Sequence, residues 1–380
     1  MKVMEQEAAR DDLAESLGQM GLSDEQAELM RVATEFAREK SPIERVRSLI
    51  EADAGYDADV WREIGQLGWL GIAIPEERGG SGLGLAEAVP IAEQLGRNML
   101  ASPFVGTNVA AQAILKAGSD EQQAKWLPEI AEGKSIWTLA VEESDVVALA
   151  ANDTGGFLVY GKARLVEWAD SADRILLLFR EKTRTHLAAV PRAALPEAAL
   201  RRETIIDDTR RAYEMTLESF EIAGSDILLD DAIPAALTQI ELAGALLTAA
   251  EMVGGSYRII DYTADYLRTR KQFGKLIGSY QALKHPLVDA FVGYERARSH
   301  LYAAANSFAD QGRGEVAVRM AKAQGEAAYA YAADRAIQFH GGFGFTYDCD
   351  AGLHRRRAIY AATRFGDARV QRRKLAELLF

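Results

Sequence analysis

Residues 174–190, with the sequence RILLLFREKTRTHLAAV, decide the architecture because they place β-type segments in the middle of a chain with helical ends. Within them, Arg174–Phe179 and Thr185–Val190 are short runs separated by charged and turn residues, which is the pattern of strands. Other runs share this pattern: Ile136–Val141, Gly156–Val166 and Tyr213–Ile222. Several short strands at close spacing predict a small barrel or sandwich.

Apolar residues on both sides of this region recur at steps of three and four, which predicts helices. Before it, Ser23 and Ser119 each begin a capping box that a glutamine three positions later completes. After it, we predict a long helix that ends near Gly274, followed by helices at 281–309, 315–338 and 353–379.

This order of elements predicts three domains, at residues 1–135, 136–230 and 231–380. Helices, then strands, then helices do not alternate as they do in a doubly wound parallel sheet. A sheet of that class is therefore not expected.

The composition excludes several classes of function. The 380 residues include 44 Lys and Arg against 56 Asp and Glu, so the net charge of −12 argues against binding nucleic acid by bulk charge. A single cysteine, Cys349, excludes a disulfide framework, and the histidines lack the spacing of metal ligands, so no metal is expected. Residues 1–12 hold no apolar targeting segment, and no stretch reaches about 20 apolar residues. We expect a cytoplasmic protein without a membrane span.

Two segments carry more information than their composition. Arg268–Gln281 contains a basic helix end followed by Gly274, which is also what an ordinary helix C-cap looks like. Gln338–Phe345 contains Gly341, Gly342 and Gly344, which would let a ligand approach the backbone closely, or would simply turn the chain after a helix. Neither segment decides between these alternatives by itself.

In this order, the two segments resemble those of the acyl-CoA dehydrogenase family, and the resemblance runs nearly the whole chain. Further matching segments are Trp61–Glu77 with Gly79-Gly80, Ser102–Phe104, Trp126–Pro128, and Gly161-Lys162 through Ala172-Asp173. The resemblance implies a mostly α fold with a central β-barrel, between an N-terminal helical domain and a C-terminal four-helix bundle. It also implies FAD-dependent α,β-dehydrogenation of an acyl-CoA thioester by a tetramer, with FAD across a subunit interface.

The family's contacts to the adenine side of FAD are present by this resemblance. Arg270 would pair with the pyrophosphate, Phe273 would pack against the cofactor, and Gln281 lies close behind. Gln338, Gly341 and Gly342 would hold the diphosphate or adenosine part. In this family these groups reach the FAD of the neighbouring subunit.

The contacts to the isoalloxazine ring depart from the family pattern. Val141 replaces the hydroxyl residue that normally bonds the flavin, and the loop after it is shortened. Arg164 occupies the usual position of the tryptophan that stacks on the flavin, and Trp168 lies four residues further on. Whether Trp168 compensates is left open by the sequence.

The catalytic base is missing from its two usual places. The glutamate that many members carry before a C-terminal glycine is Phe365, followed by Gly366, and the alternative position on the long helix holds Gly244. The nearest carboxylates on that helix are Glu241 and Glu251, which lie near the face of position 244. We take Glu241 as the candidate base; the alternative is that both are structural acids.

Two functions remain. In the first, the chain is the partner subunit of a heteromer, since it keeps what a subunit supplies to its neighbour's FAD and lacks what its own flavin needs. In the second, it is a self-sufficient homotetrameric acyl-CoA dehydrogenase that uses a relocated carboxylate such as Glu241. The resemblance also implies an electron-transfer flavoprotein as electron acceptor and, for partnered members, bulky substrates such as steroid side chains.

Overall fold

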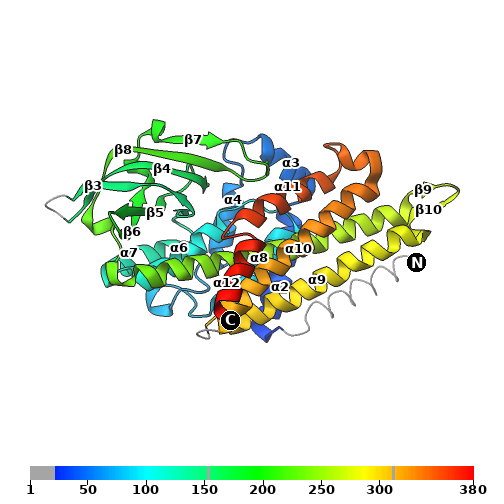
Figure 1. Cartoon of the computed structure of the whole chain (residues 1–380), viewed down its shortest axis with the longest axis horizontal. Coiled ribbons are helices and arrows are strands. Elements are labelled where there is room, and N and C mark those ends of the chain that lie inside the picture. The colour runs from blue at the N-terminus through cyan, green and yellow to red at the C-terminus, as the bar shows by residue number, and fades with distance from the viewer. Residues whose placement is uncertain (1–21, 152–154, 310–312) are drawn as a thin grey trace.

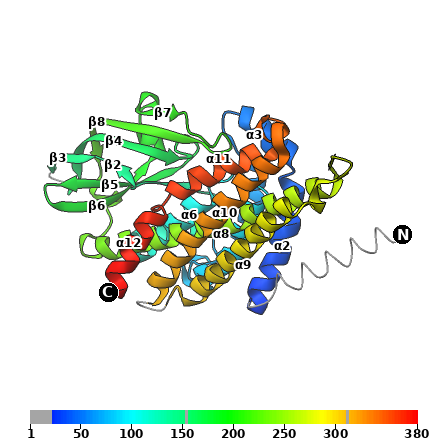
Figure 2. The same cartoon turned by 45° about the vertical axis from the view of Figure 1, so that its right-hand side comes forward.

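A computed structural model describes residues 22–151, 155–309 and 313–380, in which helices precede and follow a central sheet (Figure 1). The predicted absence of a targeting segment in residues 1–12 falls outside the described residues. Figure 2 shows the sheet to one side of the molecule, with the long C-terminal helices running side by side.

The N-terminal part of the described chain is helical, as predicted. Its helices are α2 (Asp24–Lys40), α3 (Ile43–Glu51), α4 (Ala58–Gln66), α5 (Ala88–Arg97), α6 (Phe104–Ala117) and α7 (Asp120–Ala131). Both predicted capping boxes are confirmed, since the hydroxyls of Ser23 and Ser119 accept from the backbone N–H of Gln26 and Gln122, whose side chains reach back.

The middle part is an eight-stranded sheet with order β1-β5-β3-β4-β8-β7, in which β2 also pairs with β4 and β6 with β5. Its strands are β1 (Trp137–Ala140), β2 (Glu143–Ser144), β3 (Val147–Ala151), β4 (Phe157–Glu167), β5 (Arg174–Glu181), β6 (Arg184–Pro191), β7 (Leu200–Glu203) and β8 (Ala212–Ile222). The predicted β-barrel is wrong: β1 pairs only with β5 and β7 only with β8, so these strands leave the sheet open.

The C-terminal part is again helical, with the hairpin strands β9 (Lys271–Gln272) and β10 (Lys275–Leu276) between its first two helices. The helices are α8 (Ile233–Thr269), α9 (Gln281–Ser307), α10 (Arg313–His340), α11 (Asp350–Thr363) and α12 (Ala368–Leu379). The fourth helix predicted for the bundle is therefore two helices, because the chain turns sharply between Thr363 and Ala368. Phe365 and Gly366 have φ angles of 53° and 83° there, a region that glycine adopts readily and phenylalanine does not.

Helix α8 is the central helix of the fold and packs against α5, α6, α9 and α10. Gly96 of α5 and Gly254 of α8 bring these two helices into backbone contact, because a Cβ at either glycine would overlap the main chain of the other helix. Within the described residues, 230–269 are long and apolar enough to cross a membrane by length and composition, contrary to the prediction that no stretch would be. Slightly more than half of that apolar window, 56%, is buried inside the molecule, which accounts for its composition.

The changes of element type lie close to the predicted domain boundaries. Helix α7 ends at Ala131 and β1 begins at Trp137, while β8 ends at Ile222 and α8 begins at Ile233. The division into domains at 1–135, 136–230 and 231–380 itself stays a prediction.

Candidate active site

The two positions at which the resemblance places the catalytic base are in contact with each other. A Cβ at Gly244, in the middle of α8, would overlap the ring of Phe365, which lies in the turn between α11 and α12. Phe365 is buried. One hydrocarbon ring therefore fills the place where either position would put a carboxylate.

The turn that carries Phe365, residues 364–367, is called the closed turn below, because side chains from three directions bond its main chain. Glu142 accepts from the N–H of Phe365, and the Gln371 amide donates to the carbonyl of Phe365 at 2.7 Å. Glu326 of α10 accepts from the N–H of Ala368, at 2.6 Å. These bonds hold Phe365 in a backbone conformation that is costly for a residue with a Cβ.

A buried lysine supports the closed turn from below. The ammonium group of Lys322, on α10, donates to the carbonyls of Ala361, Ala362 and Gly366 at 3.1–3.3 Å. A cation at the C-terminus of α11 is favourable, because the last carbonyls of a helix carry partial negative charge. Burial nevertheless lowers the pKa of Lys322 to about 8, against the opposing effect of nearby carboxylates.

Arg364 ties the closed turn to the sheet. Its guanidinium lies 2.9 Å from a carboxylate oxygen of Glu142, in the loop after β1, and 3.9 Å from Glu167 at the end of β4. It also donates to the carbonyl of Leu165 at 3.4 Å. Burial raises the pKa of Glu142, and Arg364 opposes that rise. The sheet and the C-terminal helices are therefore joined by an ion pair at this place.

The residues expected next to an isoalloxazine ring are committed to contacts within the chain. Arg164 donates to Glu203 at 2.7 Å and 3.0 Å instead of presenting an aromatic face. Trp168 is buried and packs edge-on against Tyr56 at a ring distance of 5.7 Å, so it does not take over the stacking position. Val141, which is partly exposed, offers no hydroxyl.

The predicted base Glu241 is held in a different set of contacts. Its carboxylate accepts from Arg319 at 2.6 Å and from Lys374 at 2.6 Å, between α8, α10 and α12. Burial alone would raise the pKa of Glu241, but the hydrogen bonds from the two cations outweigh burial and the pKa is lowered. The role of Glu241 as base thus stays a prediction that its electrostatics disfavour. Glu251 is likewise paired, with Arg210 at 2.5 Å.

The residues predicted to hold the adenine side of FAD lie at the far ends of α8 and α10, which are packed together. His340 at the end of α10 stacks on Tyr266 of α8, with ring centroids 4.2 Å apart, and Leu267, Ile277 and Phe339 form a small apolar cluster there. Figure 1 shows the β9–β10 hairpin projecting at this end. The structure therefore brings the two sequence motifs to the same end of the molecule.

At this end, called the open end below, the predicted cofactor residues are exposed. Phe273, at the tip of the hairpin, is 91% exposed and has a φ of 52°. Arg270, Gln281 and Gln338 are exposed, as are Gly341 and Gly342. Among the described residues, a Cβ at Gly341 or Gly342 would meet no atom within 4 Å. Packing within the chain therefore does not explain these glycines, whereas close approach of a ligand would.

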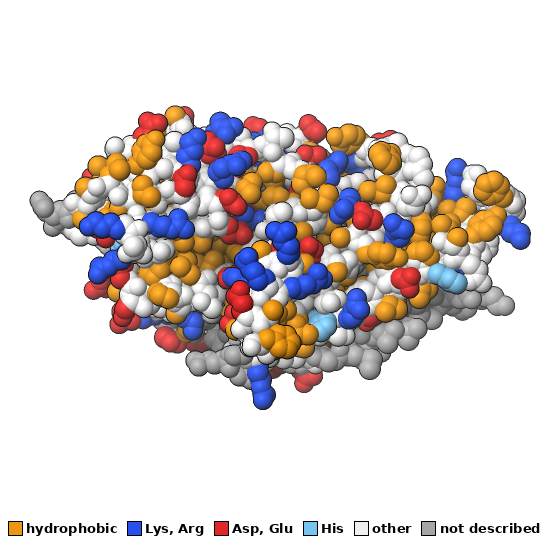
Figure 3. Space-filling view, in the orientation of Figure 1, with side chains coloured by type: hydrophobic (Ala, Val, Ile, Leu, Met, Phe, Trp, Pro, Cys, Tyr) orange, Lys and Arg blue, Asp and Glu red, His pale blue; other side chains and the backbone are white. Residues whose placement is uncertain are grey.

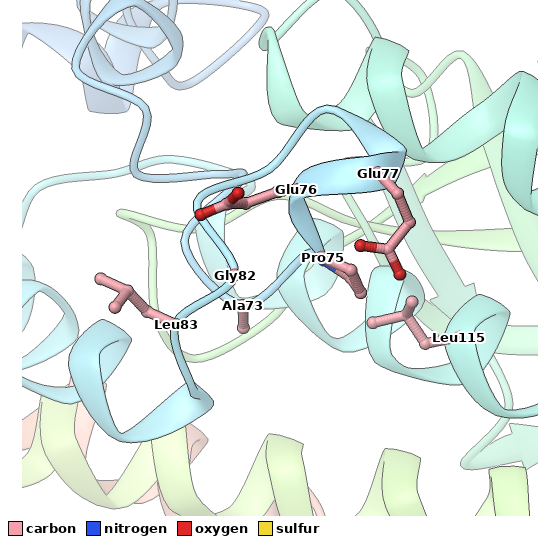
Figure 4. A pocket seen from close by; sticks show the side chains of 7 residues that line it. All are labelled: Ala73, Pro75, Glu76, Glu77, Gly82, Leu83 and Leu115. Carbon is pink, nitrogen blue, oxygen red and sulfur yellow. The ribbon is translucent and has the colours of Figure 1, made fainter.

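Two surface depressions lie away from both regions. One, of about 320 Å³, is lined by Ala73, Pro75, Glu76, Glu77, Gly82, Leu83 and Leu115, and Figure 4 shows that the two glutamates point in different directions. The other, of about 300 Å³, contains Glu241 with its ion-pair partners Arg319 and Lys374. Neither depression includes a residue of the closed turn or the open end.

Sequence reasoning missed the contributions of Glu142, Lys322 and Arg364 to the closed turn. Lys322 had a usable signal, because it falls on the same helical face as Val318, Gly325 and Tyr329, where a charged residue is out of place. Arg364 stands directly before Phe365-Gly366 but gives no sign of its distant partner. Contacts between residues 142 and 364 depend on the tertiary fold.

Comparison with known proteins identifies the family. The sequence model of the acyl-CoA dehydrogenase N-terminal domain matches residues 23–134, and that of the acyl-CoA dehydrogenase C-terminal domain matches residues 235–380. The chain therefore belongs to the acyl-CoA dehydrogenase family, whose members are FAD-dependent oxidoreductases acting on acyl-CoA.

Several relatives are similar over nearly the whole chain. The acyl-CoA dehydrogenase IpdE2 of Mycolicibacterium smegmatis is 32% identical over 94% of this chain and 99% of its own length. A chain of the ChsE4-ChsE5 complex from Mycobacterium tuberculosis superimposes with a TM-score of 0.85 at 25% identity, over 94% of this chain and 98% of that one. A chain from a variant of the Tcur3481-Tcur3483 steroid ACAD gives 0.82 at 26% identity, with the same coverage.

The two ends of an FAD molecule fit this chain differently. The exposed glycines and Arg270 of the open end suit the diphosphate and adenosine parts. At the closed turn, the residues do not fit an isoalloxazine ring with a base opposite it, because Phe365 and the Arg364–Glu142 pair occupy the contacts and Arg164 replaces the stacking aromatic residue.

Proposed function

We propose that this chain is the partner subunit of a heteromeric acyl-CoA dehydrogenase and does not itself abstract the α-proton. The observation that carries the proposal is the contact of Phe365 with Gly244, because it places a hydrocarbon ring at both possible positions of the base. Removal of an α-proton from a thioester needs a carboxylate within hydrogen-bond reach of the substrate, and a phenyl ring cannot accept a proton. The ion pairs of Glu241 support the same proposal, since they lower its pKa.

In this proposal the chain contributes to catalysis by completing the FAD site of a second chain. Arg270, Phe273, Gln281, Gln338, Gly341 and Gly342 would hold the diphosphate and adenosine end of an FAD whose isoalloxazine ring lies in that second chain. The bound FAD supplies hydride acceptance for α,β-dehydrogenation. We propose a tetramer of two such pairs, and the relative of known structure that is described as a ChsE4-ChsE5 complex supports a non-identical pairing.

The substrate and acceptor are inferred from the relatives. A structural neighbour is described as a steroid ACAD, so the proposed substrate is the CoA thioester of a steroid-derived acid. An electron-transfer flavoprotein is the proposed electron acceptor, and the cytoplasm is the proposed location.

An absorbance spectrum from about 350 to 500 nm, which covers the flavin bands, tests the proposal on the chain expressed alone and on the chain co-expressed with the family member encoded beside it. FAD and mass are measured on the same samples. We expect a colourless lone chain and a yellow complex with one FAD for each pair of chains. A lone chain that binds stoichiometric FAD and reduces a dye with an acyl-CoA would overturn the proposal.

The second candidate function is the self-sufficient enzyme, and one observation favours it. Glu142 lies at the closed turn and burial raises its pKa, as expected of a general base. However, its two oxygens are taken up by the N–H of Phe365 and the guanidinium of Arg364. If a lone chain turns over acyl-CoA, Glu142→Gln and Glu241→Gln separate the two possible bases, because only the variant lacking the true base loses activity while its partner variant keeps it.

A further inference from the structure

The first half of α9 has apolar residues on two opposite faces. Its inner face packs on α8 and on the turn before α9 through Leu283, Leu287 and Ala290. Its outer face carries Val288, Phe291 and Val292 at helical spacing, and these are 58%, 42% and 57% exposed. Because a helix on the surface of a monomer keeps its outer face polar, an apolar outer face is typical of a helix that another surface covers.

This outer face, called the α9 ridge below and formed by Val288, Phe291 and Val292, adjoins the open end. The hairpin that leads into α9 exposes Phe273 and Leu276 as well. Figures 1 and 2 show the hairpin and the start of α9 extending beyond the rest of the bundle, and Figure 3 shows apolar side chains gathered at that end. Within the described segment 281–289, no residue is buried.

The charge around the ridge is opposite to that of the whole chain. From residue 266 to residue 288 the sequence has Arg268, Arg270, Lys271, Lys275 and Lys284 and no acidic residue, although the chain carries a net charge of −12. A surface that combines an apolar strip with basic flanks fits an apolar strip with acidic or phosphate-bearing flanks.

From these observations we infer that the α9 ridge docks the FAD-bearing partner, a non-identical chain of the acyl-CoA dehydrogenase fold with an acidic contact surface. The inference rests on the proposed heteromer and names the surface that forms it. Docking on the ridge would set the exposed Arg270, Phe273 and Gly342 against the partner's cofactor, because they lie at the same end of the molecule.

A second copy of this chain fits the ridge less well, for two physical reasons. A two-fold interface places the same patch of both copies together, so the basic flanks would face each other and repel. In addition, the second copy would bring a closed turn in which Phe365 and the Arg364–Glu142 pair fill the flavin position. The open end of each copy would then have no FAD to complete.

The experiment uses the full chain co-expressed with the neighbouring family member that keeps a glutamate before its C-terminal glycine, with the affinity tag on that partner. The ridge variants are Val288→Asp and Val292→Asp. The matched control is Leu149→Asp on β3, since Leu149 is also a large apolar residue with 55% exposure. Affinity between the chains, mass by light scattering, FAD per complex and circular dichroism are measured for each. We expect each ridge variant to weaken association by at least about tenfold and the control to match the wild type.

Every outcome decides the inference. Ridge variants that fold and still bind the partner with wild-type affinity would overturn the ridge while leaving the proposed heteromer intact. A wild-type chain that never binds the partner, and forms an FAD-loaded homotetramer instead, would overturn the proposed function itself. A lone wild-type dimer that Val288→Asp converts to monomer, while binding to the partner persists, would assign the ridge to a second copy and overturn the choice of occupant.

Discussion

The closed turn and the open end differ in how their polar groups and glycines are satisfied. At the closed turn, Lys322, Glu142 and Gln371 bond main-chain groups of the turn, and Gly244 is required by the ring that packs on it. At the open end, a Cβ at Gly342 would meet no described atom within 4 Å, and Phe273 is almost fully exposed. The first region is complete within one chain, whereas the second has the residues of a binding surface but, among the described residues, nothing that covers them. This difference indicates which half of the cofactor the chain serves, and it can be tested by changing one region at a time.

The largest effect on stability is expected from Gly244→Ala. The new methyl group would overlap the Phe365 ring, and overpacking of this kind costs about 3 kcal/mol. Urea unfolding measures the change. Gly293→Ala is the matched control, because Gly293 also lies inside a helix and a Cβ there would meet no described atom within 4 Å, so this variant should gain up to about 1 kcal/mol from helix propensity. Equal effects at the two glycines would remove the basis for calling the turn closed.

Glu142→Gln should destabilise the lone chain by about 2 kcal/mol, because it leaves the buried guanidinium of Arg364 without its nearest countercharge. The glutamine can still accept from the N–H of Phe365, so the loss reports the ion pair. Thermal or urea unfolding provides the measurement. Glu28→Gln, in an exposed pair with Arg31, should leave stability unchanged. If both variants behave alike, the pair between the sheet and the helices contributes no stability to the closed turn.

The buried amine of Lys322 should give the closed turn a pH dependence. Its pKa is about 8 in the folded chain and near 10.5 when unfolded, so between these values the unfolded state binds more protons and folding is favoured as pH rises. The stability difference between wild type and Lys322→Met should therefore shift in favour of wild type by up to about 1.4 kcal/mol per pH unit over this window. Urea unfolding at about pH 7.5, about pH 9 and about pH 10 measures it. Lys275→Met, at the exposed hairpin, should show no such slope.

The smallest effect on stability is expected at the open end, from Gly342→Ala. Because its new methyl group would meet no described atom, the unfolding free energy of the lone chain should change by no more than about 0.5 kcal/mol. The same variant should lower the FAD content of the complex with the partner chain, because the methyl group would stand where the cofactor approaches the backbone. Unchanged FAD content would mean that the open end does not contact the cofactor.

Much of the fold could be predicted from the sequence, because it depends on local patterns. The capping boxes at Ser23 and Ser119, the long helices and five of the strands follow from periodicity and turn residues. The break at Phe365-Gly366 was not predicted as a helix boundary, since the apolar period continues through it and only distant groups such as Lys322 and Glu142 hold it open. The open sheet was missed for a related reason, because short runs of residues do not reveal which strands are left at the edges.

The candidate site divides in the same way. Arg270, Phe273 and the glycines of the second motif are close in sequence and could be recognised, although only the structure places the two motifs at one end. Glu241 was chosen by its helical spacing from position 244, and spacing cannot show that Arg319 and Lys374 already hold its carboxylate.

The contact between Gly244 and Phe365 also limits how this lineage can change. While the ring is present, any side chain at position 244 is excluded, so substitutions at the two positions are epistatic and their order matters. A descendant could regain a carboxylate at 365 while keeping glycine at 244, but a carboxylate at 244 would be viable only after residue 365 had become small. The first route is open in a single position, and the second passes through an intermediate with a cavity in its core.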